Sequence, residues 1–264
     1  MATLDDRPVT PDELAPLAMT SYGHFTTMRV EPGGRVKGLS LHLERLVRDS
    51  AVVFGVGVDT DGVRERVRRA VEGRDAPCVV RLTHYDPGIS LVRPVDAVRP
   101  RLLVTVRGAG AAEPAAVRVG TVAYERELPE VKHCGLFGAL HARREAQLAG
   151  YDDALFTGRD GLVSEGPTWN AGFVEGDGNG GGTVVWAAAP VLDGVTMALL
   201  RRGVAHRVGP VTPDDARGMR AAFLTNAAVG VRAVAAIDGT EMDTGHPVLG
   251  QLREAYGAVP EEVL

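Results

Sequence analysis

Lysine is almost missing from this chain. Of its 29 basic residues, only Lys37 and Lys132 are lysines, and the other 27 are arginines. The excess of arginine is typical of coding bias, so a lysine that remains is informative wherever arginine could not replace it. Guanidinium stays charged at every accessible pH, whereas an amine can lose its proton and act as a nucleophile.

Other scarcities exclude whole classes of protein. The two cysteines, Cys78 and Cys134, cannot form a disulfide framework and are expected to be reduced thiols. No apolar run approaches the roughly 20 residues that span a bilayer. Residues 1–14 carry acids where a signal peptide needs a basic segment. Because the net charge is -5, a nucleic-acid partner is also disfavoured. We therefore expect a cytoplasmic protein that binds neither nucleic acid nor membranes.

The 264 residues, 45% of them hydrophobic, suffice for two domains. Strand-like and helix-like stretches alternate, which indicates an α+β fold with largely antiparallel or mixed sheets. The stretch 109–116 is small, contains proline and has no periodic pattern, so it is the predicted linker. It separates an N-terminal α+β domain (1–110) from a C-terminal domain (117–264).

The N-terminal half shows clear local patterns. A hairpin of 24–32 and 35–42 is predicted around the Gly33-Gly34 pair, since glycine supplies the positive φ of a tight turn. Apolar residues at helical spacing predict helices over 42–56 and 61–73.

Lys132 lies at the start of a predicted helix that runs to Leu148. The larger apolar residues of this helix are expected to face inward: Leu136, Phe137, Leu140 and Leu148. A lysine beside such a core is desolvated, which disfavours its ammonium form and favours its use as a nucleophile. The alternative is a solvated lysine without a role, and Lys37, among polar neighbours beyond a turn, fits only that alternative.

Glu165 lies at the end of a strand that follows a tight turn. Such strand ends direct side chains into clefts, where a carboxylate could hold a proton on a ring nitrogen and keep an electron sink cationic. The alternative is a surface loop glutamate. Asn170, five residues further on, is expected to satisfy loop backbone groups.

Two later segments offer hydrogen-bond donors to an anion. Val195 and Thr196 begin a helical repeat, with Thr196 as the expected N-cap and the first-turn amides as an anion site. Thr225 and Asn226 add hydroxyl, amide and backbone donors at a strand end. Arg45 could supply the cation that a phosphate dianion needs. Taken singly, each is better explained as an ordinary cap or surface residue.

Taken together, the lysine, the strand-end glutamate, GVT before a helix and a late Thr-Asn pair resemble the fold-type IV pyridoxal-phosphate enzymes. That family includes the class IV aminotransferases and 4-amino-4-deoxychorismate lyase. The likeness covers nearly the whole chain, in residues 22–30, 39–46, 132–146, 160–170, 192–196 and 221–234. It implies a smaller N-terminal α/β sandwich domain, a larger C-terminal domain with a mixed, barrel-like sheet, pyridoxal 5'-phosphate between them, and a homodimer.

The resemblance also implies roles for individual residues. Lys132 matches the Schiff-base lysine, which moves a proton between cofactor carbons, and Glu165 matches the glutamate that pairs with the pyridine nitrogen. The cofactor-binding set is completed by Arg45, the backbone of Val195, Thr196, Thr225 and Asn226. The sequence departs from several members at Phe137, five residues after the lysine, where they have a tyrosine that touches the cofactor's ring oxygen.

Two reactions remain open at this level. A class IV aminotransferase, which moves an amino group between an amino acid or amine and a 2-oxo acid through an internal aldimine, is favoured. The alternatives are 4-amino-4-deoxychorismate lyase, which releases pyruvate and 4-aminobenzoate, and a catalytically silent cofactor-binding or interaction protein. His24, Thr26 and Arg107 are candidate substrate residues, and no metal site is predicted. The identity and stereochemistry of the substrate depend on pocket shape, which the sequence does not define.

Overall fold

The computed structural model describes residues 2–110, 114–176, 178 and 181–264. The chain forms two compact units. Unit 1 comprises Met1–Ala109, Val131–Leu136 and Pro260–Leu264, and unit 2 comprises Gly110–Glu130 and Phe137–Val259. Residues 111–113 of the predicted linker lie outside the described residues. No helix in the described part of the chain is long and apolar enough to cross a membrane.

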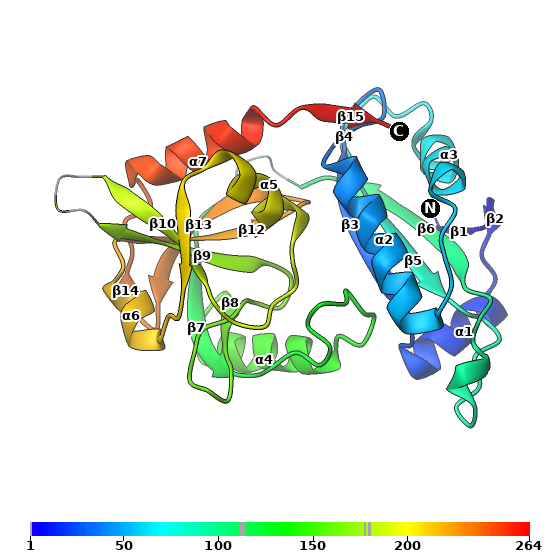
Figure 1. The fold of residues 1–264 in the computed structure, drawn as a ribbon, viewed down its shortest axis with the longest axis horizontal. Coiled ribbons are helices and arrows are strands. Elements are labelled where there is room, and N and C mark those ends of the chain that lie inside the picture. Colours follow the sequence, from blue (N-terminus) through cyan, green and yellow to red (C-terminus); the bar gives the residue numbers. More distant parts are fainter. Residues whose placement is uncertain (1, 111–113, 177, 179–180) are drawn as a thin grey trace. The chain divides into compact units, whose positions relative to one another are not determined.

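Unit 1 is built on an antiparallel sheet of five strands, in the order β2-β1-β6-β5-β3, so that β3 is an edge strand (Figure 1). These strands are Ala2–Leu4 (β1), Arg7–Pro8 (β2), His24–Val30 (β3), Cys78–Tyr85 (β5) and Arg101–Gly108 (β6). Arg35–Lys37 (β4) and Glu261–Val263 (β15) form a separate antiparallel pair. The helices are Pro11–Thr20 (α1), Leu39–Phe54 (α2) and Thr60–Val71 (α3), with a 3-10 turn at Pro94–Asp96 (η1). Apolar faces of α2 and α3 pack on one face of the sheet and form the main core of this unit.

Helix α2 begins earlier than the sequence predicts. The prediction of a strand over 35–42 is wrong, because β4 has only three residues and α2 starts directly after Gly38. Gly38 has a φ of 67°, a left-handed conformation that ends the strand. Leu39, Leu43 and Leu46 are then buried at helical spacing against the sheet, so packing of this face overrides the local strand pattern.

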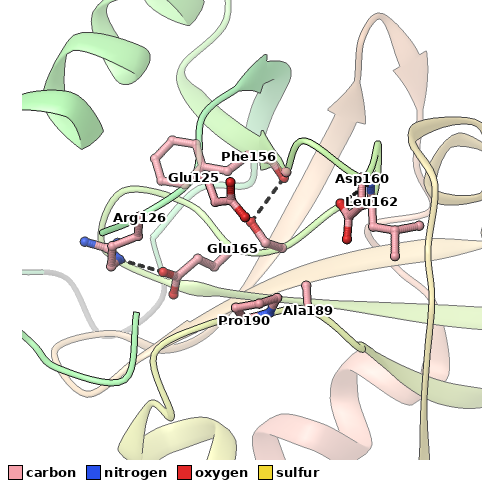
Figure 2. A pocket seen from close by; sticks show the side chains of 10 residues that line it. Glu125, Arg126, Phe156, Asp160, Leu162, Glu165, Ala189 and Pro190 are labelled. Atoms are coloured by element: carbon pink, nitrogen blue, oxygen red, sulfur yellow. Dashed lines mark hydrogen bonds and ion pairs between the residues drawn. The ribbon is translucent and has the colours of Figure 1, made fainter. Parts of the chain in front are cut away.

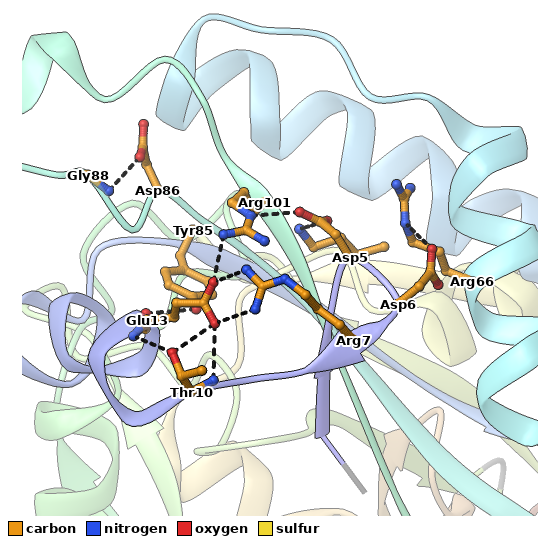
Figure 3. Close-up of polar contacts among 11 residues, drawn as sticks. Asp5, Asp6, Arg7, Thr10, Glu13, Arg66, Tyr85, Asp86, Gly88 and Arg101 are labelled. Carbon is orange, nitrogen blue, oxygen red and sulfur yellow. Dashed lines mark hydrogen bonds and ion pairs between the residues drawn. The ribbon is translucent and has the colours of Figure 1, made fainter.

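A network of ion pairs attaches the N-terminal segment to the end of this sheet (Figure 3). Glu13 in the first turn of α1 accepts hydrogen bonds from Arg7 and from Arg101, the latter at 2.8 Å, and Thr10 completes a capping box with it. Arg101 also donates to Asp5 at 2.7 Å. The hydrogen bond from Arg7 is the main cause that holds the pKa of Glu13 below its ordinary value. The network therefore fixes where α1 begins.

Unit 2 contains an eight-stranded mixed sheet with the order β11-β10-β9-β12-β13-β7-β8, and β14 paired to β13. Its strands are Val117–Ala123 (β7), Asp153–Thr157 (β8), Asn170–Gly176 (β9), Gly182–Ala187 (β10), His206–Gly209 (β11), Ala221–Asn226 (β12), Gly230–Ile237 (β13) and Thr240–Glu241 (β14). Its helices are Phe137–Leu148 (α4), Val195–Gly203 (α5), Pro213–Gly218 (α6) and Pro247–Gly257 (α7). The N–H of Val163, beside β8, donates to the carbonyl of Val211, beyond β11, at 2.7 Å. The two sheet ends are thus linked, as in a barrel.

Helix α4 differs from the predicted helix in its start and in its buried face. It begins at Phe137, so Lys132 precedes it, and the expectation that its large apolar residues face inward is wrong. Phe137, Leu140 and Leu148 are 83%, 48% and 67% exposed. The buried face consists of alanines, Ala139, Ala142 and Ala146, which let the helix approach Ala154 and Phe156 of β8 closely. Small residues, not large ones, mark the inner face of this helix.

The two units also differ from the predicted domains in two short segments. Val131–Leu136, which carries Lys132, belongs to unit 1 because it exchanges backbone hydrogen bonds with Gly23 and Phe25 at β3. Pro260–Leu264 returns to unit 1, where β15 pairs with β4 and Leu264 is buried in the core. Both segments join partners that are remote in sequence, so no local pattern predicts them.

Candidate active site

The backbone of Lys132 is held on both sides within unit 1. Its N–H donates to the Oδ2 atom of Asp49 on α2 at 2.9 Å, and its carbonyl accepts the N–H of Phe25 at 2.8 Å. Cys134 then donates its N–H to the carbonyl of Gly23 at 2.8 Å. The segment therefore extends along edge strand β3, and the position of the Lys132 Cα is defined without a helix.

The Lys132 amine and one arginine contact the same aromatic ring. The Nζ atom of Lys132 lies 4.9 Å from the centroid of the Phe25 ring, and the Arg81 guanidinium carbon lies 3.6 Å from it. Arg81 also donates to the hydroxyl of Thr83 at 3.2 Å and to the sulfur of Cys134 at 3.9 Å. Two cationic groups beside one ring form a place that suits an anionic ligand.

Arg45 belongs to a buried polar network on the helix side of unit 1. Its Nη2 atom donates to the Thr26 hydroxyl at 2.6 Å, and that oxygen lies 2.7 Å from Nδ1 of His42. The Nη2 atom of Arg45 also lies 3.3 Å from Nδ1 of His42. Because arginine can only donate, an Nδ1 without a proton suits both contacts, with the Thr26 hydroxyl as its donor. Burial, followed by the charges of Arg45 and Lys132, lowers the pKa of His42 well below its ordinary value.

The two substrate candidates on β3 are both buried. Thr26 is part of the Arg45 network. His24 packs against the rings of Phe54 and His84, with centroid distances of 5.9 and 5.4 Å. Burial, and then the neighbouring His84, lower the pKa of His24 to about 3. In unit 1 these side chains thus belong to the interior on the α2 side.

Glu165 in unit 2 is buried and paired with an arginine (Figure 2). The Nε atom of Arg126 donates to Oε1 of Glu165 at 2.7 Å. The other oxygen, Oε2, accepts the N–H of Leu192 at 3.3 Å and the side-chain amide of Asn170 at 3.4 Å. The alternative of a surface glutamate is therefore wrong. The pair also lines a small pocket together with Phe156.

The start of α5 lies beside Glu165's neighbour Asn170. A Cβ atom on Gly194 would lie 2.0 Å from the Asn170 side-chain oxygen, so only glycine allows this close approach. Asn170 donates to the carbonyl of Leu192 at 2.7 Å, which confirms its expected structural role. It is also the cross-strand partner of Thr225 on β12. These contacts bring the segment before α5, the end of β12 and Glu165 to one region of unit 2.

Two threonine hydroxyls in this region are buried without a hydrogen-bond partner among the described residues, those of Thr196 and Thr225. The prediction that Thr196 is the N-cap is wrong, because Gly194 occupies that position and no side chain caps α5. The first-turn amides of α5, which begins at Val195, remain available in the way that suits a phosphate. Unsatisfied buried hydroxyls are rare, so these two are suited to a group that binds beside them.

The comparisons with known proteins bear directly on this arrangement. A family model described as amino-transferase class IV matches residues 23–237. The chain belongs to this family. No curated protein matches the chain.

Solved structures of aminotransferases are similar in fold. A branched-chain aminotransferase from Thermoproteus uzoniensis, solved with norvaline, has a TM-score of 0.82 at 23% identity, covering 97% of this chain and 93% of that one. A fold IV-transaminase from Curtobacterium pusillum gives 0.78 at 23%, covering 95% and 90%. A hypothetical aminotransferase from Mycobacterium tuberculosis, in its PLP-bound form, gives 0.81 at 20%, covering 98% of each chain. The predicted fold class is confirmed.

Membership of this family makes the chain a pyridoxal-phosphate enzyme, as predicted. The residues present fit that cofactor. In unit 2, the two unsatisfied hydroxyls and the α5 amides suit its phosphate, and the buried Glu165 carboxylate suits its ring nitrogen. In unit 1, Lys132 offers an amine and Arg45 a guanidinium.

Three other predicted positions are placed differently. The side-chain oxygen of Asn226 accepts the N–H groups of Ala228 and Val229 at 3.0 Å each, so it stabilises its own turn. Arg107 is exposed on β6. Phe137, at the position where the sequence departs from the predicted tyrosine of several members, is exposed at the start of α4 beside His141.

The sequence analysis missed three residues that contact candidate site residues within their own unit: His42 and Asp49 on α2, and Arg126 beside Glu165. The sequence pattern does indicate His42 and Asp49. Together with Arg45 they form polar positions three and four residues apart, on one face of an otherwise leucine-lined helix. Arg126 has no local signal, because its partner lies 39 residues away.

Proposed function

We propose that this chain is an aminotransferase that moves an amino group between an amino acid and a 2-oxo acid, with Lys132 as the residue that holds the cofactor covalently and moves the substrate proton. When bound, pyridoxal phosphate supplies an aldehyde that a lysine amine can hold and a ring that accepts electrons from the substrate. The observation that carries the proposal is the fixed position of Lys132, whose amine lies beside Phe25 and near a second cation.

The other residues bind and orient. Thr196, Thr225 and the α5 amides of unit 2 are proposed to hold the phosphate. The role of Arg45 in unit 1 as a phosphate-binding residue remains a prediction of the sequence. Glu165, which pairs with Arg126, is proposed to hold a proton on the ring nitrogen. Arg81 shares the Phe25 ring with Lys132, so it is the proposed anchor for a substrate carboxylate, in place of the exposed Arg107.

A homodimer is proposed as the working form. Phe137 is exposed, and it lines an apolar groove with Tyr124 and His141 on unit 2, which a second copy of the chain could cover. Light scattering on the purified protein should give twice the mass of the chain, and a monomeric mass would contradict this proposal. The cytoplasmic location remains a prediction of the sequence.

Turnover tests the proposed reaction. The protein, supplied with pyridoxal phosphate, is incubated with a panel of amino donors and 2-oxoglutarate, and the new amino and 2-oxo acids are measured by chromatography. Transfer that is lost in Lys132→Ala but kept in Lys37→Ala is expected. Release of pyruvate and 4-aminobenzoate from aminodeoxychorismate, without transfer, would show a lyase. No turnover of any kind would leave a silent binding protein.

A further inference from the structure

Asp49 presents its carboxylate to the peptide of Lys132, and we propose that it is the positioning residue for the Lys132 amine. The inference rests on the proposed function of Lys132. The Oδ2 atom of Asp49 accepts the Lys132 N–H at 2.9 Å, and this is a contact between a helix and a segment 83 residues away. The Oδ1 atom accepts Nε and Nη2 of Arg48, at 3.0 and 2.9 Å. Each oxygen therefore has its own donor.

Burial of the Asp49 carboxylate has a desolvation free-energy cost, which this contact helps to offset. Its side chain is 0% exposed, whereas its partner Arg48 is nearly half exposed. A buried carboxylate is destabilising unless donors satisfy it, and one of the two donor groups here is the backbone of the candidate catalytic lysine. An apolar residue would satisfy core packing at this position. The presence of a carboxylate is therefore explained by the hydrogen bond that it accepts from the Lys132 N–H.

The same helix face also carries Arg45. Asp49 follows Arg45 by four residues, so both lie on one side of α2, and both are buried. Arg45 reaches the Thr26 hydroxyl on β3, the strand whose Phe25 donates to the other side of the Lys132 residue. Helix α2 thus positions Arg45 and Lys132 relative to each other, and it contacts Lys132 through the Asp49 side chain.

Loss of this link should affect the lysine more than the rest of the molecule. The segment Val131–Leu136 forms no helix or strand of its own, and Lys132 and Cys134 attach it to the region of β3 by one backbone hydrogen bond each. Without Asp49, the Lys132 carbonyl remains bonded to Phe25 but its N–H loses its acceptor. A displacement of about 1 Å in a reacting group can lower a rate about 100-fold.

Two variants and one control separate this role from general stability. Asp49→Ala removes the acceptor, and Asp49→Asn keeps an acceptor oxygen while it removes the charge. Glu44→Ala, an exposed carboxylate of the same helix, is the matched control. The rate of covalent attachment is measured by adding pyridoxal phosphate and quenching with borohydride at intervals. Mass spectrometry then gives the labelled fraction of the Lys132 peptide at each time. Affinity for pyridoxamine phosphate, which cannot attach covalently, is measured on the same proteins.

We expect attachment to slow at least 30-fold in Asp49→Ala, with the affinity for pyridoxamine phosphate within threefold of wild type. Asp49→Asn should stay within about fivefold, and Glu44→Ala should be unchanged. Hydrogen exchange of the Lys132 amide in the cofactor-free proteins should be fast in Asp49→Ala alone, which gives a readout independent of the cofactor.

Attachment at the wild-type rate in Asp49→Ala would overturn the inference. Equal losses of attachment and of pyridoxamine phosphate binding would also overturn it, because they would indicate a general collapse. If Asp49→Ala does not fold, a 30-fold loss in Asp49→Asn would contradict the hydrogen-bond account. An unlabelled Lys132 in the wild-type protein would instead overturn the proposed function, and this inference with it.

Discussion

Removal of the Arg126 guanidinium should destabilise the protein strongly, because it would leave the Glu165 charge buried and without its cation. Glu165 is 3% exposed, and the two side chains are joined at 2.7 Å. Breaking one partner of such a buried pair costs about 3–5 kcal/mol. For a chain of this size, 1 kcal/mol shifts the melting temperature by about 2–4 °C. Arg126→Met should therefore lower the melting temperature by roughly 6–20 °C.

The same unit contains a matched control. Arg159 pairs with Glu125 at 3.5 Å, but its side chain is 94% exposed. An exposed pair contributes at most about 1 kcal/mol, so Arg159→Met should shift the melting temperature by less than about 4 °C. Calorimetry on the cofactor-free proteins measures both shifts.

A second substitution tests the cause. In Arg126→Met, the further change Glu165→Gln removes the uncompensated charge, so the double variant should melt at a higher temperature than Arg126→Met alone. Equal shifts in Arg126→Met and Arg159→Met, or a double variant that melts lower still, would refute the argument that Arg126 serves to neutralise Glu165.

Three further predictions concern other groups. Burial lowers the pKa of His24 to about 3 from an ordinary value of 6.5, so the stability that neutral His24 provides is complete above pH 6.5 and is lost as the pH falls toward 3. The melting temperature of His24→Leu should therefore fall less between pH 7 and pH 4 than that of wild type. Equal falls in the two proteins would contradict this prediction. Thr225→Val should weaken pyridoxamine phosphate binding about tenfold and leave the cofactor-free melting temperature nearly unchanged, because the hydroxyl has no partner among the described residues; unchanged affinity would remove Thr225 from the phosphate site. Arg81→Gln should raise the KM for a 2-oxo acid at least tenfold with kcat less affected, since a hydrogen bond to a charged group contributes about 1.5–3 kcal/mol to binding. A selective loss of kcat would argue against a carboxylate anchor.

The sequence predicts the chemistry of this chain better than its local geometry. Taken together, Lys132, Glu165 and Thr196 resemble the pattern of one family, and the family model bears out that family, while the roles of these residues stay predictions. Local patterns failed where packing between distant segments decides. Lys132 was expected on a helix, but hydrogen bonds to Asp49 and Phe25 place it on an extended segment.

Residue size misled the prediction in a second place. In α4, large apolar residues such as Phe137 face outward and alanines face inward, because the close approach to β8 leaves no room for longer side chains. Size alone therefore gave the wrong buried face. Arg126 could not be found at all, since its role depends on a partner that only the fold brings near.

The central claim is that the amine of Lys132 holds the cofactor, and the scarcity of lysine makes it directly measurable. The protein is incubated with pyridoxal phosphate, reduced with borohydride, digested and examined by mass spectrometry. Lys37, on β4, is the only other lysine in the chain and serves as an internal control. We predict one pyridoxyl group per chain, on Lys132, and none on Lys37. A label on Lys37 instead, equal labelling of both, or no label at saturating cofactor would contradict the account.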